Sequence, residues 1–168
     1  MPNKKYQEGF SLIEVIVSII VFIVVIIGVT ALISFNISNS ALLRNRLIAA
    51  NLAQEGIEIV RNIRDKNFLD QESDHSIQWN RDLSAGNNYR VVYNSHQLLS
   101  PADVPLYFHN SSGIFDYDSV GATPSIFYRT VSIQNINSNE IRVTSTVSWR
   151  ERGQDFSLSV QDHLFNWK

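Results

Sequence analysis

The sequence predicts an α+β fold in which one long N-terminal helix packs against an antiparallel β-sheet from the C-terminal third of the chain. Three observations support this prediction. A membrane-length apolar run lies near the N-terminus, an amphipathic stretch continues it at helical spacing, and three alternating runs lie near the C-terminus. Of the 168 residues, about a hundred remain after this helix, enough for one small domain outside the membrane.

The apolar run follows a short basic leader and holds no ionisable residue between Val15 and Phe35. At about 1.5 Å per residue, its roughly 21 residues span about 31 Å, close to the thickness of a bilayer's hydrocarbon core. Glu14 is the single carboxylate at its start. A charge in a membrane segment costs roughly 2.5 to 3.5 kcal/mol at the bilayer centre, so Glu14 is a candidate functional residue.

Helical periodicity continues over residues 44–65, with apolar side chains at spacings of three and four. One stripe contains Leu43, Leu47, Ala50, Ala53, Ile57 and Val60, and a neighbouring stripe contains Ile48, Leu52, Ile59 and Ile63. We expect the sheet to cover these stripes, and Arg61 to pair with Asp65 one turn later. Gly28 and Gly56 are the predicted weak points, because glycine inside a helix costs about 1 kcal/mol relative to alanine.

The remaining residues, 66–168, are predicted to form one extramembrane domain. It should begin with an irregular connecting loop over residues 66–88, because this stretch is polar and lacks a regular period. Strands are expected at residues 89–93 and 106–109. Residues 110–124 are rich in turn-forming types and should lie on the surface.

Three alternating runs, residues 126–133, 141–149 and 156–160, predict two successive β-hairpins. Alternate residues of a strand share one face, and this face should cover the helix. Its expected members are Phe127, Val131, Ile133, Ile141, Val143, Val147, Trp149, Phe156, Leu158 and Val160. The tail, residues 164–167, is too apolar for a free end and is expected to dock onto the domain.

The residues before the apolar run carry a family resemblance. A short basic leader is followed by Gly9, Phe10, Ser11 and, four residues after Phe10, Glu14. This arrangement resembles the type IV prepilin signal. In that family a membrane peptidase cuts after the glycine on the cytoplasmic side, the new N-terminal residue is N-methylated, and the fifth mature residue is glutamate. The resemblance implies cleavage between Gly9 and Phe10, N-methylation of Phe10 and an assembly role for Glu14.

The resemblance also implies a pilin-like fold divided into a leader, residues 1–9, a membrane and filament-core helix, residues 10–43, an amphipathic helix, residues 44–65, and the β-sheet domain already described. The chain departs from the family pattern in two places. Ser11 stands where the family often has threonine, and the helix lacks the proline that often bends it. If this helix bends on assembly, the bend is expected at Gly28.

A secretory signal peptide and an uncleaved signal anchor are the two other interpretations of the N-terminus. The apolar run is longer than a secretory hydrophobic region of roughly 7 to 15 residues, and no A-x-A-like cleavage site follows it. Basic residues flank the run on both sides, so the positive-inside rule leaves the orientation open. The extracytoplasmic placement of the C-terminal domain is therefore implied by the resemblance.

Composition gives no support for nucleic-acid binding or catalysis. The formal net charge is −2, which does not favour a nucleic-acid partner. The chain has no cysteine for disulfides, zinc thiolates or a thiol nucleophile. Its four histidines lack metal-ligand spacing, and no nucleophile-elbow motif is present. We expect neither enzymatic activity nor a cofactor.

A calcium loop was also considered, because Asp70, Glu72 and Asp74 resemble the opening of one. No glycine follows at the turn, and Arg81 occupies the twelfth place, where a glutamate is required. A solvated acidic loop is the favoured interpretation. The closely spaced Asp116 and Asp118 are likewise not predicted to hold a metal.

The resemblance implies a structural subunit of a type IV pilus-like filament. The C-terminal run of the chain, with FYRTVSI, VTSTVSW and the closing Asn166-Trp167, is similar to that of PilV-like minor pilins. The implied partners are other pilins, the prepilin peptidase and methyltransferase, an inner-membrane assembly platform and membrane lipid. The alternatives left open are a pseudopilin of a type II secretion or competence machine, and a signal-anchored binding module that does not assemble.

Overall fold

The computed structural model describes Gly9 and residues 11–167; residues 1–8, Phe10 and Lys168 are not described. The predicted leader, apart from Gly9, and the predicted methylation site therefore lie outside the described residues. The chain divides into two compact units, Met1–Leu43 and Arg44–Lys168, which are described separately. One helix contributes residues to both units.

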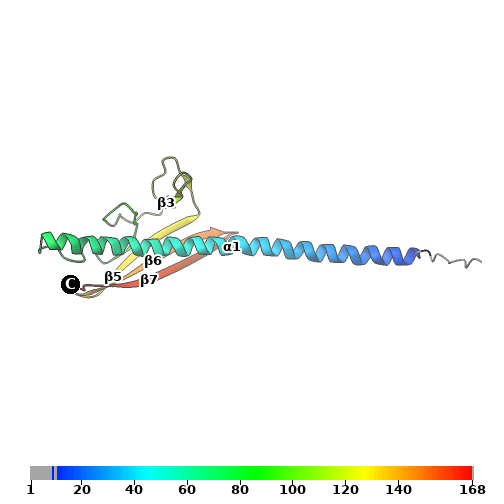
Figure 1. Ribbon diagram of the computed structural model, residues 1–168, viewed down its shortest axis with the longest axis horizontal. Coiled ribbons are helices and arrows are strands. Elements are labelled where there is room, and N and C mark those ends of the chain that lie inside the picture. Colours follow the sequence, from blue (N-terminus) through cyan, green and yellow to red (C-terminus); the bar gives the residue numbers. More distant parts are fainter. Residues whose placement is uncertain (1–8, 10, 168) are drawn as a thin grey trace, which may run out of the picture. The chain divides into compact units, whose positions relative to one another are not determined.

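This helix, α1, covers Leu12–Ser73 and is continuous through both of its glycines (Figure 1). It ends eight residues beyond the predicted end at Asp65, so the prediction of a loop from residue 66 was wrong for residues 66–73. The extension is stabilised by burial of Phe68, which is 2% exposed. The buried Asn67 side chain also donates hydrogen bonds to the Trp79 carbonyl at 3.1 Å and the Arg81 carbonyl at 2.7 Å.

The main sheet has four antiparallel strands in the order β1-β5-β6-β7. Its strands are β1 (Gly86–Tyr89), β5 (Phe127–Asn137), β6 (Glu140–Glu151) and β7 (Gln154–Phe165). The last three form the two predicted hairpins, each strand running longer than expected. The tight turn between β6 and β7 places Arg152 and Gly153 at positive φ, as primed two-residue hairpin turns require.

A second sheet has three short strands in the order β3-β2-β4. They are β2 (Tyr107–His109), β3 (Ile114–Asp116) and β4 (Thr123–Pro124). The strand predicted near residue 106 is confirmed, whereas residues 110–124 contribute two strands that the turn-rich composition had hidden. The ring of Phe115 in β3 lies 4.8 Å from that of Phe108 and 6.2 Å from that of Phe127. These contacts pack β3 against the core, which the local composition does not indicate.

The core lies between the residue 44–73 segment of α1 and one face of the main sheet, which confirms the predicted α+β architecture. Figure 1 shows this segment running along strands β5, β6 and β7. The face predicted for β5 and β6 is buried, and the three residues predicted for β7 are partly buried against it. The helix stripe was wrong at Leu43 and Leu47, each 63% exposed, because the buried contact begins at Ala49.

Gly56 lies where α1 approaches β5 and β6 most closely. A Cβ atom added there would contact the Ser145 hydroxyl and lie 3.3 Å from Cδ of Arg129. Both neighbours are buried, so they have little room to move. This glycine therefore permits helix–sheet contact and is more than a weak point in the helix, whereas Gly28 has nothing within 4 Å of such an atom.

Arg129 is a buried cation that the sequence analysis did not single out. It shares the inward face of β5 and is 2% exposed. Its guanidinium donates to the carbonyls of Leu52 at 3.2 Å and Val91 at 2.8 Å, and lies 3.3 Å from the Glu55 carboxylate. The Tyr117 hydroxyl donates to the Arg129 carbonyl at 2.8 Å, and burial raises the pKa of this tyrosine.

Contacts of Arg61 and of the C-terminal tail were also predicted from the sequence. Arg61 pairs with Glu58 at 2.6 Å and with Asp162 of β7 at 2.7 Å, so the predicted partner Asp65 was wrong. Asp162 on β7 and Glu58 on the helix together give Arg61 two ion pairs, whereas a pair within the helix alone would give it one. In the tail, Leu164 is buried, whereas Trp167 stays 63% exposed with its ring 4.7 Å from that of Phe68.

Candidate functional site

The candidate site is the beginning of α1, where Gly9, Ser11 and Glu14 lie. Gly9 is exposed and non-helical, and helix α1 begins at Leu12. The Ser11 carbonyl accepts the first helical bonds, from the amides of Glu14 at 3.0 Å and Val15 at 3.2 Å. Ser11 and Glu14 have the spacing of a capping box, a sequence signal for the start of a helix.

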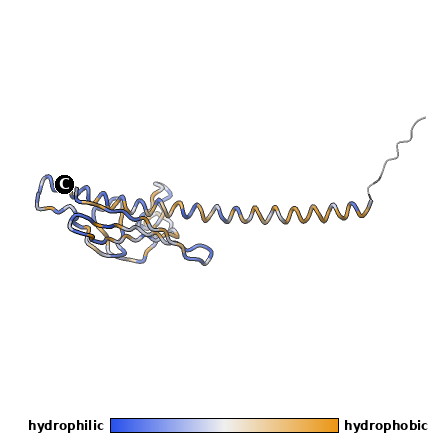
Figure 2. The backbone as a smooth tube through the Cα atoms, turned by 90° about the horizontal axis from the view of Figure 1, so that it is seen from below, coloured by the Kyte–Doolittle hydropathy of each residue, from blue (hydrophilic) through white to orange (hydrophobic). Residues whose placement is uncertain are grey.

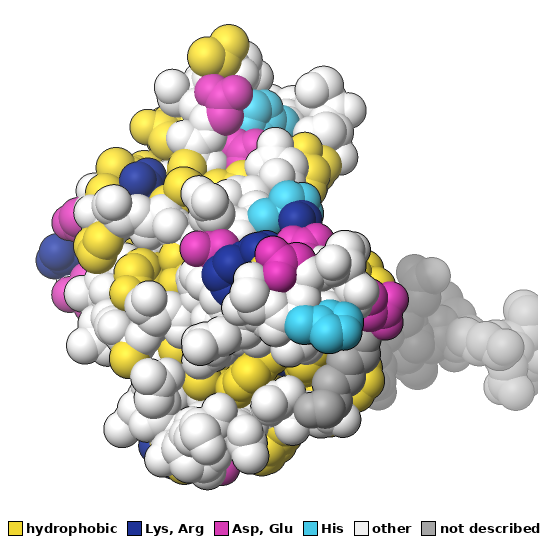
Figure 3. Space-filling view, turned by 90° about the vertical axis from the view of Figure 1, so that its left-hand side faces the viewer, with side chains coloured by type: hydrophobic (Ala, Val, Ile, Leu, Met, Phe, Trp, Pro, Cys, Tyr) yellow, Lys and Arg dark blue, Asp and Glu magenta, His cyan; other side chains and the backbone are white. Residues whose placement is uncertain are grey.

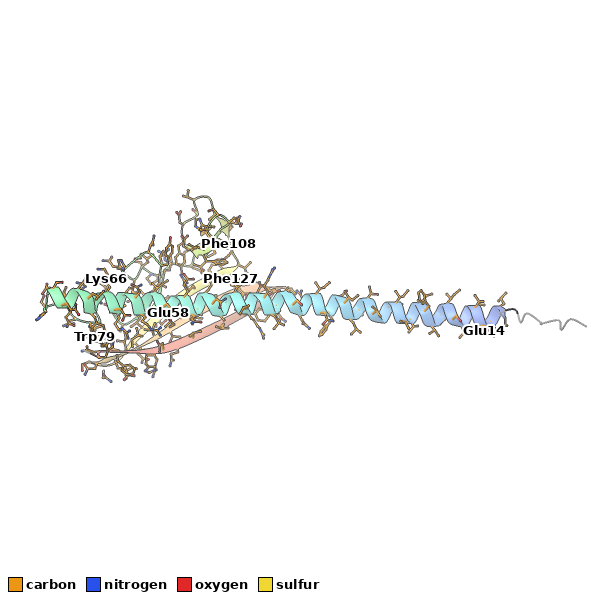
Figure 4. The ribbon with its side chains drawn as sticks, viewed as in Figure 1. Glu14, Glu58, Lys66, Trp79, Phe108 and Phe127 are labelled. Atoms are coloured by element: carbon orange, nitrogen blue, oxygen red, sulfur yellow. The ribbon has the colours of Figure 1, made fainter. Side chains whose placement is uncertain are left out.

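Glu14 occupies the first turn of α1 (Figure 4), where the positive end of the helix dipole favours a carboxylate. Within the part of the chain that the structure describes, its side chain has no hydrogen-bond or ion-pair partner. The side chains beside it are apolar and exposed, including Ile13 and Val15. A carboxylate in such surroundings within a membrane is costly unless it is paired or reaches the headgroup region.

The first unit presents an apolar surface that its own residues leave uncovered. Among the described residues, α1 is the one helix long and apolar enough to cross a membrane, and none of its most apolar window is buried (Figure 2). Phe22, Leu32 and Phe35 are each more than 60% exposed. Exposed apolar area of this extent requires lipid or other protein to cover it.

The hydroxyl groups of this surface bond to their own helix. Ser18 donates to the Glu14 carbonyl at 2.7 Å, and Ser34 donates to the Thr30 carbonyl at 3.0 Å. The Thr30 hydroxyl in turn donates to the Ile26 carbonyl. Because these three hydroxyl groups are bonded within the helix, none of them is left as an unpaired donor in an apolar environment.

Val15, Ser18, Ile19 and Phe22 line a shallow apolar groove of about 480 Å³ one turn beyond Glu14. The groove carries a single polar side chain, that of Ser18, whose hydroxyl is already bonded to the helix. As an apolar surface it can be covered by lipid or by another apolar helix.

The acidic stretch considered for calcium is part of an ion-pair group. Asp70 accepts a hydrogen bond from Arg81 at 2.5 Å and lies 3.3 Å from the Lys66 ammonium. The Arg81 bond, followed by that of Lys66, lowers the pKa of Asp70. The residue at the twelfth place thus neutralises the first carboxylate. No group of three or more potential metal ligands is found among the described residues.

In the second unit, acidic and basic side chains are interspersed. Figure 3 shows one face on which Asp and Glu side chains lie next to Lys, Arg and His. Arg64 pairs with Asp65 at 2.7 Å, and His109 contacts Asp116 at 2.9 Å. Such mixed pairing differs from the continuous basic surface that nucleic-acid binding requires.

Residues 4–30 match the family model of the prokaryotic N-terminal methylation motif. This segment contains Gly9, Ser11 and Glu14, together with most of the exposed apolar surface of the first unit. No curated protein and no solved structure matches the chain. The match supports a type IV pilin-like protein, a structural class and not an enzyme class.

Proposed function

We propose that this chain is a structural subunit of a type IV pilus-like filament, processed by a prepilin peptidase and assembled through its N-terminal helix. The match of residues 4–30 to the methylation motif is the observation that carries the proposal. It is supported by a membrane-length helix whose apolar side chains remain exposed within their own unit. In this role the helix first anchors the chain in the cytoplasmic membrane.

The first step in this proposal is cleavage between Gly9 and Phe10. The glycine is exposed and lies outside the helix, which supports its proposed role as the residue before the cleaved bond. Cleavage creates an α-amine on Phe10, which stays largely protonated near neutral pH and becomes the proposed site of N-methylation.

The second step is pairing of that amine with Glu14 of a neighbouring subunit. Glu14 lacks a partner among the described residues, and an unpaired carboxylate is costly in an apolar environment. A cation from the next subunit would neutralise it and fix the axial register of the two helices. The exposed apolar surface then exchanges lipid contacts for contacts with neighbouring helices.

Among filament subunits, we place this chain with the minor pilins, because its C-terminal run is similar to that of PilV-like proteins. A pseudopilin of a secretion or competence machine is the alternative, since it shares the N-terminal features. Both assignments place residues 44–168 outside the cytoplasm and require the same partners, namely other pilins, the peptidase and an assembly platform. A signal-anchored binding module would lack processing and assembly.

Cleavage can be tested by intact-mass analysis of the protein purified from membranes. We expect a chain that begins at Phe10 and carries one added methyl group. A Gly9→Val variant should retain the full leader, because its branched side chain obstructs the peptidase. A wild-type chain that still begins at Met1 would contradict the proposed processing.

The assembly role of Glu14 can be tested with Glu14→Ala, measured by the amount of subunit in sheared filaments. We expect loss of incorporation with cleavage largely retained, because the register-setting pair is removed. Asp103→Ala, which removes an exposed carboxylate of the second unit, is the matched control and should incorporate normally. Normal incorporation of Glu14→Ala would contradict this role.

A further inference from the structure

The two sheets of the second unit present four edges, and three of them are short or interrupted. At one edge of the main sheet, β1 has four residues with a register shift between Gly86 and Tyr89. In the small sheet, β3 has three residues, and β4 has two, one of them Pro124. Short strands, irregular register and proline are the devices that keep sheet edges from pairing with other chains.

Strand β7 forms the fourth edge and is long, regular and free of proline; the one charge in phase with its inward apolar residues, Asp162, is paired with Arg61 at 2.7 Å. It has 12 residues, all paired with β6 from Gln154 to Phe165 without a register shift. It contains no lysine, arginine, proline or glycine. Sheet order leaves its other side unpaired within the part of the chain that the structure describes. About half of its residues therefore direct backbone N–H and C=O groups outward.

The side chains of β7 define what could pair there. On the inward face, Phe156, Leu158 and Val160 are partly buried against the core, so an added strand could extend this apolar row. On the other face, Ser157 and Ser159 are small and exposed and leave the backbone accessible. Asp155, 81% exposed at the side chain, makes a long contact of 3.7 Å with Arg150.

Strand β6 shows which sequence suits β7. It runs antiparallel to β7, alternates apolar and polar residues, and places Arg150 opposite Asp155. A strand on the free side would meet the same side chains of β7 in the same alternation. A partner segment should therefore carry alternating apolar residues and a cation in register with Asp155.

A second copy of the chain is a poor occupant. Pairing of two β7 strands around a two-fold axis would reverse the direction of residues 44–73 of α1 in the second copy. Subunits anchored in one membrane must instead point the same way, an argument that rests on the proposed function. Pairing of β7 with β1 of another copy is limited by the short, irregular β1 edge, which continues into the Arg90–Leu99 bridge.

We propose that the outer edge of β7 binds an extended segment of a different protein, which adds to the sheet as a fifth, antiparallel strand and places a lysine or arginine opposite Asp155. Backbone hydrogen bonds supply the binding, and the alternating side chains select the register. The site thus recruits a second protein to the exposed domain without using the N-terminal helix.

The test uses the full, unprocessed chain in detergent micelles and a synthetic peptide with the 12-residue sequence of β6 as the probe. Amide hydrogen exchange is measured by NMR. We expect the peptide to slow the exchange of alternate β7 amides about tenfold while the β1 amides remain unchanged. A matched peptide with its alternate edge amides N-methylated should give no protection.

Charge reversal tests the register. Asp155→Lys should weaken binding of the peptide about threefold, and a peptide with glutamate in place of its second arginine should restore it. The proposal is overturned if β7 stays unprotected at millimolar peptide, if the methylated peptide protects equally, or if β7 becomes protected by self-association without peptide. Because the measurement needs neither cleavage nor filaments, its failure is distinguishable from failure of the proposed function.

Discussion

At the residue scale, two charged groups lie in apolar surroundings and differ in how they are satisfied. Arg129 is buried inside the second unit and bonds to two carbonyls and a carboxylate from other elements. Glu14 lies on the exposed apolar surface without a partner among the described residues. A buried charge with several partners serves the fold, whereas one without a partner points to another molecule.

Replacing Arg129 with methionine should lower the free energy of unfolding by about 2–4 kcal/mol, because two carbonyls lose their donor and Glu55 loses its counter-ion. Urea denaturation of the protein in micelles, followed by tryptophan fluorescence, measures this change. Arg150→Met is the control: this side chain is 70% exposed, and the cost should stay below about 0.5 kcal/mol. Equal costs for both variants would contradict the bonding role of Arg129.

The sequence analysis singled out Glu14 but not Arg129. Glu14 stands out because it interrupts an apolar run, a property of neighbouring residues. Arg129 lies at an inward position of an alternating strand, between Phe127 and Val131. An apolar residue is expected at such a position, so the arginine departs from the pattern there. Its partners come from residues 52, 55 and 91, which only folding brings together.

At the element scale, the end of α1 is determined by contacts with the following loop. Asp70 bonds to Arg81 and Lys66, and the Asp74 amide donates to the Asp70 carbonyl at 2.9 Å. The lowered pKa of Asp70 means that its ionised form stabilises this end. The stabilisation is present above the unfolded-state pKa of an aspartate, about 3.9, and is lost as pH falls through the lower folded-state pKa.

We therefore expect Asp70→Asn to speed amide exchange in the last turn of α1 near neutral pH, as measured by NMR. At a pH below the folded-state pKa of Asp70, the variant and the wild-type protein should exchange at the same rate, because the wild-type carboxyl is then neutral. Asp65→Asn removes the same charge nearby but not the Arg81 bond, and should leave this turn unchanged. An equal effect from Asp65→Asn would point to net charge instead.

At the scale of the whole molecule, the two units differ in what stabilises them. Both core clusters consist of residues between Ala49 and Leu164, so the second unit has a complete core of its own. The described residues of the first unit contribute to neither cluster, so the stability of this unit depends on what surrounds it. This division suits a subunit that exchanges a lipid environment for a protein one while its outer domain stays folded.

A chain limited to residues 44–168 should accordingly be soluble and folded without detergent. Its near-UV circular dichroism, from buried Trp79 and Trp149, should match that of the full protein in micelles, and its urea midpoint should be nearly the same. The comparison also measures any contribution of the first unit to folding. Loss of the near-UV signal in the short chain would show that residues before 44 are needed.

The sequence by itself determined the features that depend on neighbouring residues: the apolar run, the processing motif around Gly9, the start of the amphipathic helix and the two C-terminal hairpins. Periodicity encodes these directly, since side chains three or four apart share a helix face and alternate residues share a strand face. Only the tertiary structure decided that α1 continues to Ser73, that residues 110–124 contain two strands and that Arg129 lies in the core. It also decided that β7, not β1, leaves a long open edge. These outcomes depend on contacts between residues far apart in the chain, which no local pattern records.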